Sequence, residues 1–244
     1  MYEDRRMDRQ LAPPAPHFIP PGALCVRVAV PLGALAALVF ALVATGWQPL
    51  LELDRRTVTG LHGPALRHPG WTHTNRVLTD WVWDPVTMRI VLAAAAGWLL
   101  VRGERLLALW VVATAAVTTG IQQGLKWAFD RERPRWAEPV DSAHYAALPS
   151  GHAMTAAVTC ALLLWLVHRA GAGAAVRWTV WTVACVSVAG VSFTRVWLGV
   201  HWPTDTVAGV LLGLALTVTA IAGWNALAAR RRWQDGAPAG RIPA

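Results

Sequence analysis

The length of its uncharged apolar runs constrains this chain more than any other feature. Residues 28–51, 106–125 and 206–229 contain no Asp, Glu, Lys or Arg. An α-helix needs about 20 apolar residues to cross the hydrocarbon core of a bilayer. Only 15% of the chain is charged, whereas a soluble domain usually has about 25%. The sequence therefore predicts a membrane protein whose spanning helices satisfy their own backbone hydrogen bonds.

Further apolar runs bring the expected total to six transmembrane helices, which predicts an all-α polytopic bundle. The expected spans are residues 24–46, 85–101, 106–129, 150–167, 178–198 and 203–229. We expect a disordered cytoplasmic tail in residues 1–23, a six-span domain in 24–229 and a basic cytoplasmic tail in 230–244. The connection formed by residues 47–84 contains several tryptophans and is expected to form interfacial helices, because tryptophan favours the membrane–water boundary.

The arginines predict the orientation of the bundle. Both tails are rich in arginine, and Arg102, Arg105, Arg169 and Arg177 occupy two short connections that fall on the same side as the tails. By the positive-inside rule, that side is cytoplasmic, so the chain is expected to be a multi-pass plasma-membrane protein. The net charge of +8 does not indicate nucleic-acid binding, because no basic stretch resembles a DNA-reading helix.

Three polar clusters interrupt the apolar pattern, and the topology places all of them on the extracytoplasmic face. They are residues 126–134, 149–152 and 194–205. Cations at this depth are costly unless they are paired or functional. Lys126, Arg133 and Arg195 together predict a site for a dianionic phosphate, since arginine binds phosphate oxygens through a bidentate fork. For each cation taken singly, snorkelling to the interface is the alternative.

The cluster of residues 149–152, with the sequence Pro-Ser-Gly-His, has the form of a helix start. Ser150 is the expected N-cap. Free amides at a helix N-terminus attract an anion, and Gly151 would let a ligand approach the backbone. His152 would then face that anion from the first turn of the helix.

The third cluster contains a histidine with a carboxylate four residues later. Pro203 fits the first position of a helix, which places Asp205 in the first turn after His201. A carboxylate at this spacing can accept a hydrogen bond from one imidazole nitrogen and make the other nitrogen more basic. Interaction with the helix dipole is an alternative role for Asp205, but it does not account for His201.

These clusters resemble the signature of the type 2 phosphatidic acid phosphatase family, or lipid phosphate phosphatases, which shares a core with vanadium-dependent haloperoxidases. The signature is Lys, six residues, Arg-Pro; then Pro-Ser-Gly-His; then Ser-Arg, five residues, His, three residues, Asp. Every spacing in this chain matches. The only departure is Thr194 in place of the usual serine, and threonine keeps the hydroxyl group.

The resemblance implies a metal-independent hydrolase without a cofactor. His201 would attack phosphorus and form a phosphohistidine, Asp205 would orient it, and His152 would protonate the leaving oxygen. The residues implied in binding the phosphate are Lys126, Arg133, Ser150, Gly151 and Arg195. The implied substrate is a lipid phosphate or diphosphate in the bilayer, since relatives handle phosphatidate, undecaprenyl diphosphate and phosphatidylglycerol phosphate. The composition favours a bacterial source.

Three alternatives to this function remain open. A haloperoxidase could use the same pocket for vanadate, although those enzymes are typically soluble. A transporter could use the intramembrane cations as a substrate path, although it would not require these motif spacings. A metal hydrolase could be built from His144, His152 and His201. The sequence leaves the identity of the lipid and the oligomeric state undetermined.

Overall fold

The protein is a helical bundle with a helical cap across one end, as seen in a computed structural model that describes residues 22–236. Within this range there is no β-strand, so the all-α prediction is confirmed. The elements are α1 (Gly22–Ala44), α2 (Gln48–Arg67), α3 (Pro69–Val77), the π-helical turn η1 (Leu78–Val82), α4 (Pro85–Val101), α5 (Arg105–Phe129), α6 (Gly151–Arg169), α7 (Ala174–Trp197) and α8 (Pro203–Gly236).

Six helical stretches are long and apolar enough to cross a membrane, which confirms the expected number of spans. They are α1, α5, α6, α7, most of α8, and the stretch Pro69–Val101 that ends with α4. α8 continues through residues 230–236, so the basic segment expected as a tail begins within this helix. Most of the two expected tails, residues 1–21 and 237–244, lies outside the described part of the chain.

α6 is the central helix of the bundle. It packs against α4, α5, α7 and α8, and 56% of its spanning segment is buried, compared with 17% for α1 and for α7. Two glycines let the backbone of α8 approach α6 closely. A Cβ atom on Gly209 would lie 2.8 Å from the carbonyl oxygen of Ser150, and one on Gly213 would lie 3.0 Å from that of Met154. Small residues of this kind are typical of close helix contacts in membranes.

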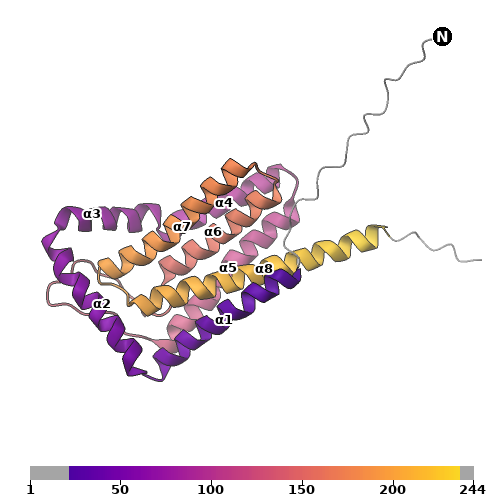
Figure 1. The fold of residues 1–244 in the computed structure, drawn as a ribbon. Helices are drawn as coiled ribbons and strands as arrows, with labels where there is room; N and C mark the ends of the chain where they lie inside the picture. The colour runs from indigo at the N-terminus through magenta and orange to yellow at the C-terminus, as the bar shows by residue number, and fades with distance from the viewer. Residues whose placement is uncertain (1–21, 237–244) are drawn as a thin grey trace, which may run out of the picture.

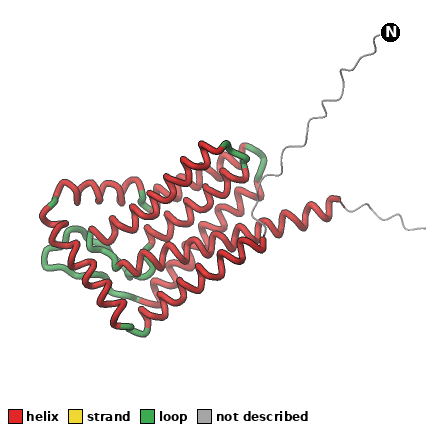
Figure 2. Tube along the Cα trace, in the orientation of Figure 1, coloured by secondary structure: helices red, strands yellow, loops and turns green. Residues whose placement is uncertain are grey.

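The connection of residues 47–84 is helical, as predicted. Figure 1 shows α2 crossing one end of the bundle, and Figure 2 shows loops gathered beneath it at the same end. α2 turns Val58 and Ala65 inward, and both side chains are fully buried. Trp71 and Trp81 are exposed. The start of α1 and the end of α8 lie at the opposite end of the bundle (Figure 1).

Candidate active site

The three polar clusters meet at the end of the bundle that α2 covers. The first follows the end of α5, the second begins α6, and the third joins α7 to α8. A tight turn after α7 directs the third cluster inward, with Gly199 at a φ of +68°. The indole Nε1 of Trp136 donates to the carbonyl oxygen of Gly199 at 3.0 Å, so this turn is fixed from outside.

His201 is buried directly after this turn and is only 1% exposed. Its Nδ1 lies 3.2 Å from Oδ2 of Asp205 in the first turn of α8. The same Oδ2 atom accepts the backbone N–H of Trp202 at 2.9 Å. Because Nδ1 donates to this carboxylate, Nε2 carries the imidazole lone pair and points away from Asp205.

The surroundings of His201 favour its uncharged form. Burial lowers the pKa of His201 well below its usual value, and the positive charges of Arg133, Arg195 and Lys126 lower it further. Both effects disfavour adding a proton to the ring. His201 is therefore uncharged, and its Nε2 lone pair lies in an environment rich in positive charge.

Arg133 holds the loop above His201. Its Nη1 donates to the carbonyl oxygen of Val200 at 2.6 Å and lies 3.1 Å from Nε2 of His201. Its Nε donates to the carbonyl oxygen of Tyr145 at 2.8 Å. Burial lowers the pKa of Arg133, while the charge of Asp205 opposes that shift. The guanidinium stays positive, because arginine is not deprotonated in proteins.

Two further cations approach from the ends of α5 and α7. The Nζ atom of Lys126 donates to the carbonyl oxygen of Ala146. Arg195 is only 5% exposed, and its Nε is buried without a hydrogen-bond partner in residues 22–236. A buried guanidinium with an unused donor is costly. An anion bound between these cations would remove that cost.

The start of α6 differs from the expectation in one respect. Ser150 has the extended backbone of an N-cap, but its side chain makes no capping hydrogen bond. Its Oγ is buried without a partner among the described residues, while its backbone N–H donates to the carbonyl oxygen of Asp205 at 2.9 Å. Ser150 is therefore the N-cap by position, as predicted, but its hydroxyl does not cap the helix and is free to serve a ligand.

Gly151 has a packing role that the motif did not reveal. A Cβ atom there would lie 2.6 Å from Nε2 of Gln122 on α5, so a side chain would displace Gln122. The absence of a side chain lets α5 and α6 come together beside the site. It also leaves the first amides of α6 open to an anion.

His152 lies on the other side of the site and has a partner that the sequence did not predict. Its Nε2 is 3.8 Å from Oδ2 of Asp84. The other carboxylate oxygen of Asp84 accepts the N–H of Val86 at 2.7 Å and so caps α4. An aspartate before Pro85 is a typical N-cap signal, but its contact with α6 depends on the tertiary fold.

Arg131 and Asp54 were also missed as members of the site. Arg131 donates to Oδ1 of Asp205 at 2.5 Å and to Oδ2 of Asp54 at 2.8 Å. Asp54, on α2, accepts the backbone N–H of Thr204 at 3.0 Å and its hydroxyl at 2.5 Å. The Asp54 side chain is only 2% exposed. The helix that covers the bundle thus holds the first turn of α8 and the carboxylate behind His201.

All residues that the motifs predicted for the site come together at this end of the bundle. They are Lys126, Arg133, Ser150, Gly151, His152, Arg195, His201 and Asp205. Within residues 22–236, no group of three or more His, Cys, Asp or Glu side chains is placed to hold a metal ion. The alternative metal site of His144, His152 and His201 therefore has no geometric support.

Comparison with known proteins gives consistent results. The model of the PAP2 superfamily matches residues 107–228, half of the chain. An undecaprenyl-diphosphatase of Sulfolobus acidocaldarius is 27% identical over 143 residues, which cover 55% of this chain and 59% of that protein. YbjG of Escherichia coli, provisionally named for the same activity, is 29% identical over 150 residues, covering 59% and 70%. The chain thus spans less than two thirds of the first relative.

A solved structure shares the fold. It is the crystal structure of a transmembrane PAP2 type phosphatidylglycerolphosphate phosphatase from Bacillus subtilis. The TM-score is 0.70, and the match covers 82% of this chain and 96% of the other. At 20% sequence identity, this likeness concerns the arrangement of the helices.

Proposed function

Because the chain belongs to the PAP2 superfamily, we propose that it is an integral-membrane phosphatase that hydrolyses a phosphomonoester or diphosphate of a lipid through a phosphohistidine. The observation that carries the proposal is His201, buried with Asp205 on Nδ1 and with Nε2 turned toward Arg133. A nucleophile oriented by a carboxylate and surrounded by fixed cations is suited to attack on phosphorus.

In the first step, the lone pair of His201 Nε2 forms a bond to phosphorus as the bond from phosphorus to the leaving oxygen breaks. The imidazole gains positive charge, which Asp205 stabilises from 3.2 Å. Arg131 and the N–H of Trp202 hold Asp205 in place, so the carboxylate does not have to reorient during the reaction. Such preorganised groups are the usual source of electrostatic catalysis.

The non-bridging oxygens of the phosphate would be bound by Lys126, Arg133 and Arg195. Ser150 Oγ and the first amides of α6 would add neutral donors. Phosphoryl transfer spreads negative charge over these oxygens, and catalysis depends chiefly on positioning and on stabilising that charge.

His152 would donate its proton to the leaving oxygen, and Asp84 lies close enough to stabilise its charged form before the transfer. In the second step, a water molecule that gives its proton to His152 attacks the phosphohistidine. The bond from nitrogen to phosphorus breaks, inorganic phosphate departs, and His201 returns to its neutral form.

We also propose that the site lies on the extracytoplasmic face and that it works without a metal ion. The arginines of the two short connections and of α8 beyond residue 229 lie at the end opposite His201, which supports an extracytoplasmic site. A substrate in the outer leaflet would then reach the site from the membrane. Catalysis by histidine and fixed cations does not require a metal ion.

A substrate panel tests the proposal. Purified protein in detergent is given lipid monophosphates and lipid diphosphates, and released phosphate is measured with and without excess chelator. We expect release from at least one class, unchanged by the chelator. No release from any lipid by folded protein would contradict the phosphatase assignment. Activity that is lost with chelator and restored by a divalent metal would contradict only the metal-independent mechanism.

A further inference from the structure

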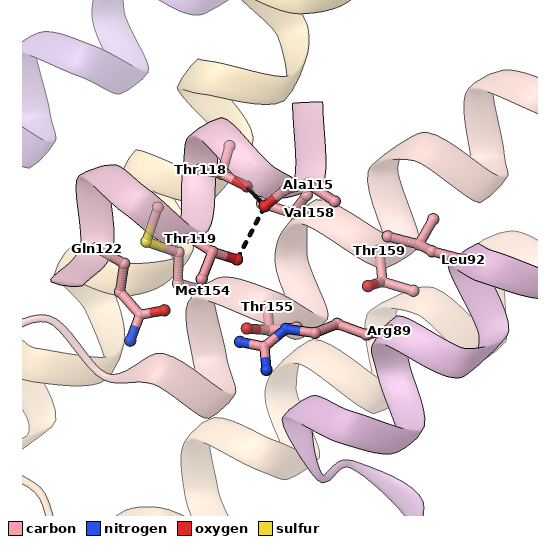
Figure 3. Close-up of a pocket in the computed structure, with 10 residues that line it drawn as sticks. All are labelled: Arg89, Leu92, Ala115, Thr118, Thr119, Gln122, Met154, Thr155, Val158 and Thr159. Carbon is pink, nitrogen blue, oxygen red and sulfur yellow. Dashed lines mark hydrogen bonds between the residues drawn. The ribbon is translucent and has the colours of Figure 1, made fainter. Parts of the chain in front are cut away.

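A narrow polar groove lies between α4, α5 and α6 (Figure 3). Its polar lining consists of Arg89, Thr118, Thr119, Gln122, Thr155 and Thr159. Arg89 lies one turn inside α4, and Figure 3 shows its guanidinium extending past Thr155 toward the α5 side of the groove. An arginine within a membrane span marks a functional site unless it only snorkels.

The polar groups of the groove fall into two sets. Thr118 and Thr119 donate to carbonyl oxygens of their own helix, at 2.9 Å and 2.8 Å, and are therefore satisfied. In contrast, no hydrogen bond or ion pair joins the side chain of Arg89 or that of Thr155 to any described residue. The hydroxyl of Thr159 is buried without a partner in the described part of the chain. The guanidinium of Arg89 thus has donors without a partner among the described residues, at an exposed position within a membrane-spanning stretch.

The groove continues the site rather than forming a separate one. Thr155 follows His152 by three residues and therefore shares its face of α6. Gln122 is 4% exposed and lies against Gly151, one turn before Lys126 on α5. Arg89 is on the helix that Asp84, the partner of His152, begins. A ligand extending past His152 would meet Arg89.

The geometry of the proposed reaction indicates which part of a substrate extends from His152 toward Arg89. In phosphoryl transfer, the leaving oxygen lies in line with the nucleophile and on the opposite side of phosphorus. His152 serves that oxygen, so the rest of the lipid leaves past His152. In a lipid diphosphate, the next atom is a second phosphorus with charged oxygens. In a lipid monophosphate, it is an uncharged carbon.

We propose that Arg89, with Gln122 and Thr155, binds the second phosphate of a lipid diphosphate, an inference that rests on the proposed function. The groove is narrow, and the side chain of Arg89 is exposed at its mouth. The second phosphate therefore lies at the mouth against the guanidinium, and the lipid chain continues into the membrane. Arg89 would make the enzyme prefer diphosphates over monophosphates.

The experiment compares a polyprenyl diphosphate with the polyprenyl monophosphate of the same chain length, in the same detergent. The R89Q variant should lose about 10- to 100-fold in kcat/KM on the diphosphate, as expected for a charge-assisted hydrogen bond. The ratio of kcat/KM for the diphosphate to that for the monophosphate should fall by a similar factor. R89K should keep part of this preference, because lysine retains the charge without the planar fork.

R56Q is the matched control, since Arg56 is an exposed arginine on α2 outside the site. It measures how much the loss of one positive surface charge weakens the binding of anionic lipids in general. It should leave the ratio unchanged. An equal loss of kcat/KM on both lipids in R89Q would overturn the inference. Arg89 would then only anchor α4 at the membrane interface. If R89Q does not fold, the ratio in R89K decides, and an unchanged ratio there overturns it. A wild-type protein inactive on both lipids would contradict the proposed function instead.

Discussion

The two histidines of the site are held in opposite ways. The side chain of His201 is 1% exposed and that of its partner Asp205 is 0% exposed, with 3.2 Å between Nδ1 and Oδ2. The side chain of His152 is 20% exposed and that of Asp84 is 28% exposed, with 3.8 Å between them. The side of the proposed nucleophile is buried, with His201 and Asp205 hydrogen-bonded to each other, whereas the side of the proposed acid is more open and loosely paired.

This difference follows from what each side must do. A nucleophile gains from a fixed direction and from exclusion of water, because small displacements from the attack geometry cost large factors in rate. The acid must reach a leaving oxygen that carries a bulky lipid and must then let that lipid depart. A tight network around His152 would hinder this release. The comparison predicts different responses when each side is altered.

The largest effect is expected for His201→Asn. This change removes the Nε2 lone pair that we propose attacks phosphorus, and loss of a catalytic nucleophile typically lowers the rate by roughly 10⁴-fold or more. Phosphate release by the purified variant measures the effect. Unchanged elution from a sizing column and an unchanged melting temperature would show that the variant folds. Near-normal activity would contradict the phosphohistidine mechanism.

A smaller effect, which depends on the leaving group of the substrate, is expected for His152→Asn. Loss of a general acid costs about 10²- to 10⁴-fold when the leaving oxygen needs a proton. A nitrophenyl phosphate has a leaving group that departs without protonation, so this substrate should recover most of the lost rate in the His152 variant. It should not recover the rate of the His201 variant. An equal loss on lipid and nitrophenyl substrates would remove His152 from the role of acid.

The closed side also shows what the sequence can and cannot predict. The contact between His201 and Asp205 was predictable, because a spacing of four residues across the start of a helix at Pro203 places the two side chains together. The contact of Arg131 with Asp54 joins residues 77 positions apart. It exists because α2 folds back over the end of the bundle, and no local pattern specifies that path.

On the open side, the helix start could be predicted from the sequence, but the contacts of single side chains could not. The helix start at Ser150 was predicted from its Pro-Ser-Gly-His sequence, but the direction of the hydroxyl was not. The six spans were predictable because lipid requires long apolar helices. The pairing of His152 with Asp84 was not predictable, since it depends on how α4 packs against α6.

An intermediate effect is expected for Asp54→Asn, which tests the network behind Asp205. The amide keeps the shape of the side chain but loses the charge that faces Arg131. Arg131 and Asp205 should shift, and a displacement of the nucleophile of under about 1 Å can cost up to roughly 10²-fold. We expect a fall of about 10- to 100-fold in kcat with little change in KM, because Asp54 does not touch the substrate.

Glu52→Gln is the matched control for Asp54, since Glu52 lies on the same helix but is 43% exposed and pairs with Arg55 and Arg56 at the surface. Exposed ion pairs of this kind contribute little to stability, so activity should stay close to that of the wild type. If both variants lose activity equally, α2 only covers the end of the bundle and Asp54 has no specific role in positioning Asp205. If neither loses activity, Asp54 does not position Asp205.

The smallest effect concerns the dependence of stability on pH. The buried site lowers the pKa of His201, whereas the same residue in the unfolded chain titrates near pH 6.5. Between these two values the unfolded chain binds more protons than the folded protein. The contribution of His201 to stability is therefore complete above about pH 6.5 and decreases as the pH falls, by up to about 1.4 kcal/mol per pH unit.

Melting temperatures of the wild type and of His201→Asn in detergent, measured from pH 7.5 to 5, isolate this contribution from that of the other histidines. The wild-type melting temperature should fall more steeply below pH 6.5 than that of the variant. Glu52, whose pKa is lowered by hydrogen bonds from Arg56 and Arg55, titrates in a more acidic range and does not interfere. Parallel curves would mean that folded His201 takes up a proton as easily as in the unfolded chain, and the closed side would then not keep its nucleophile neutral.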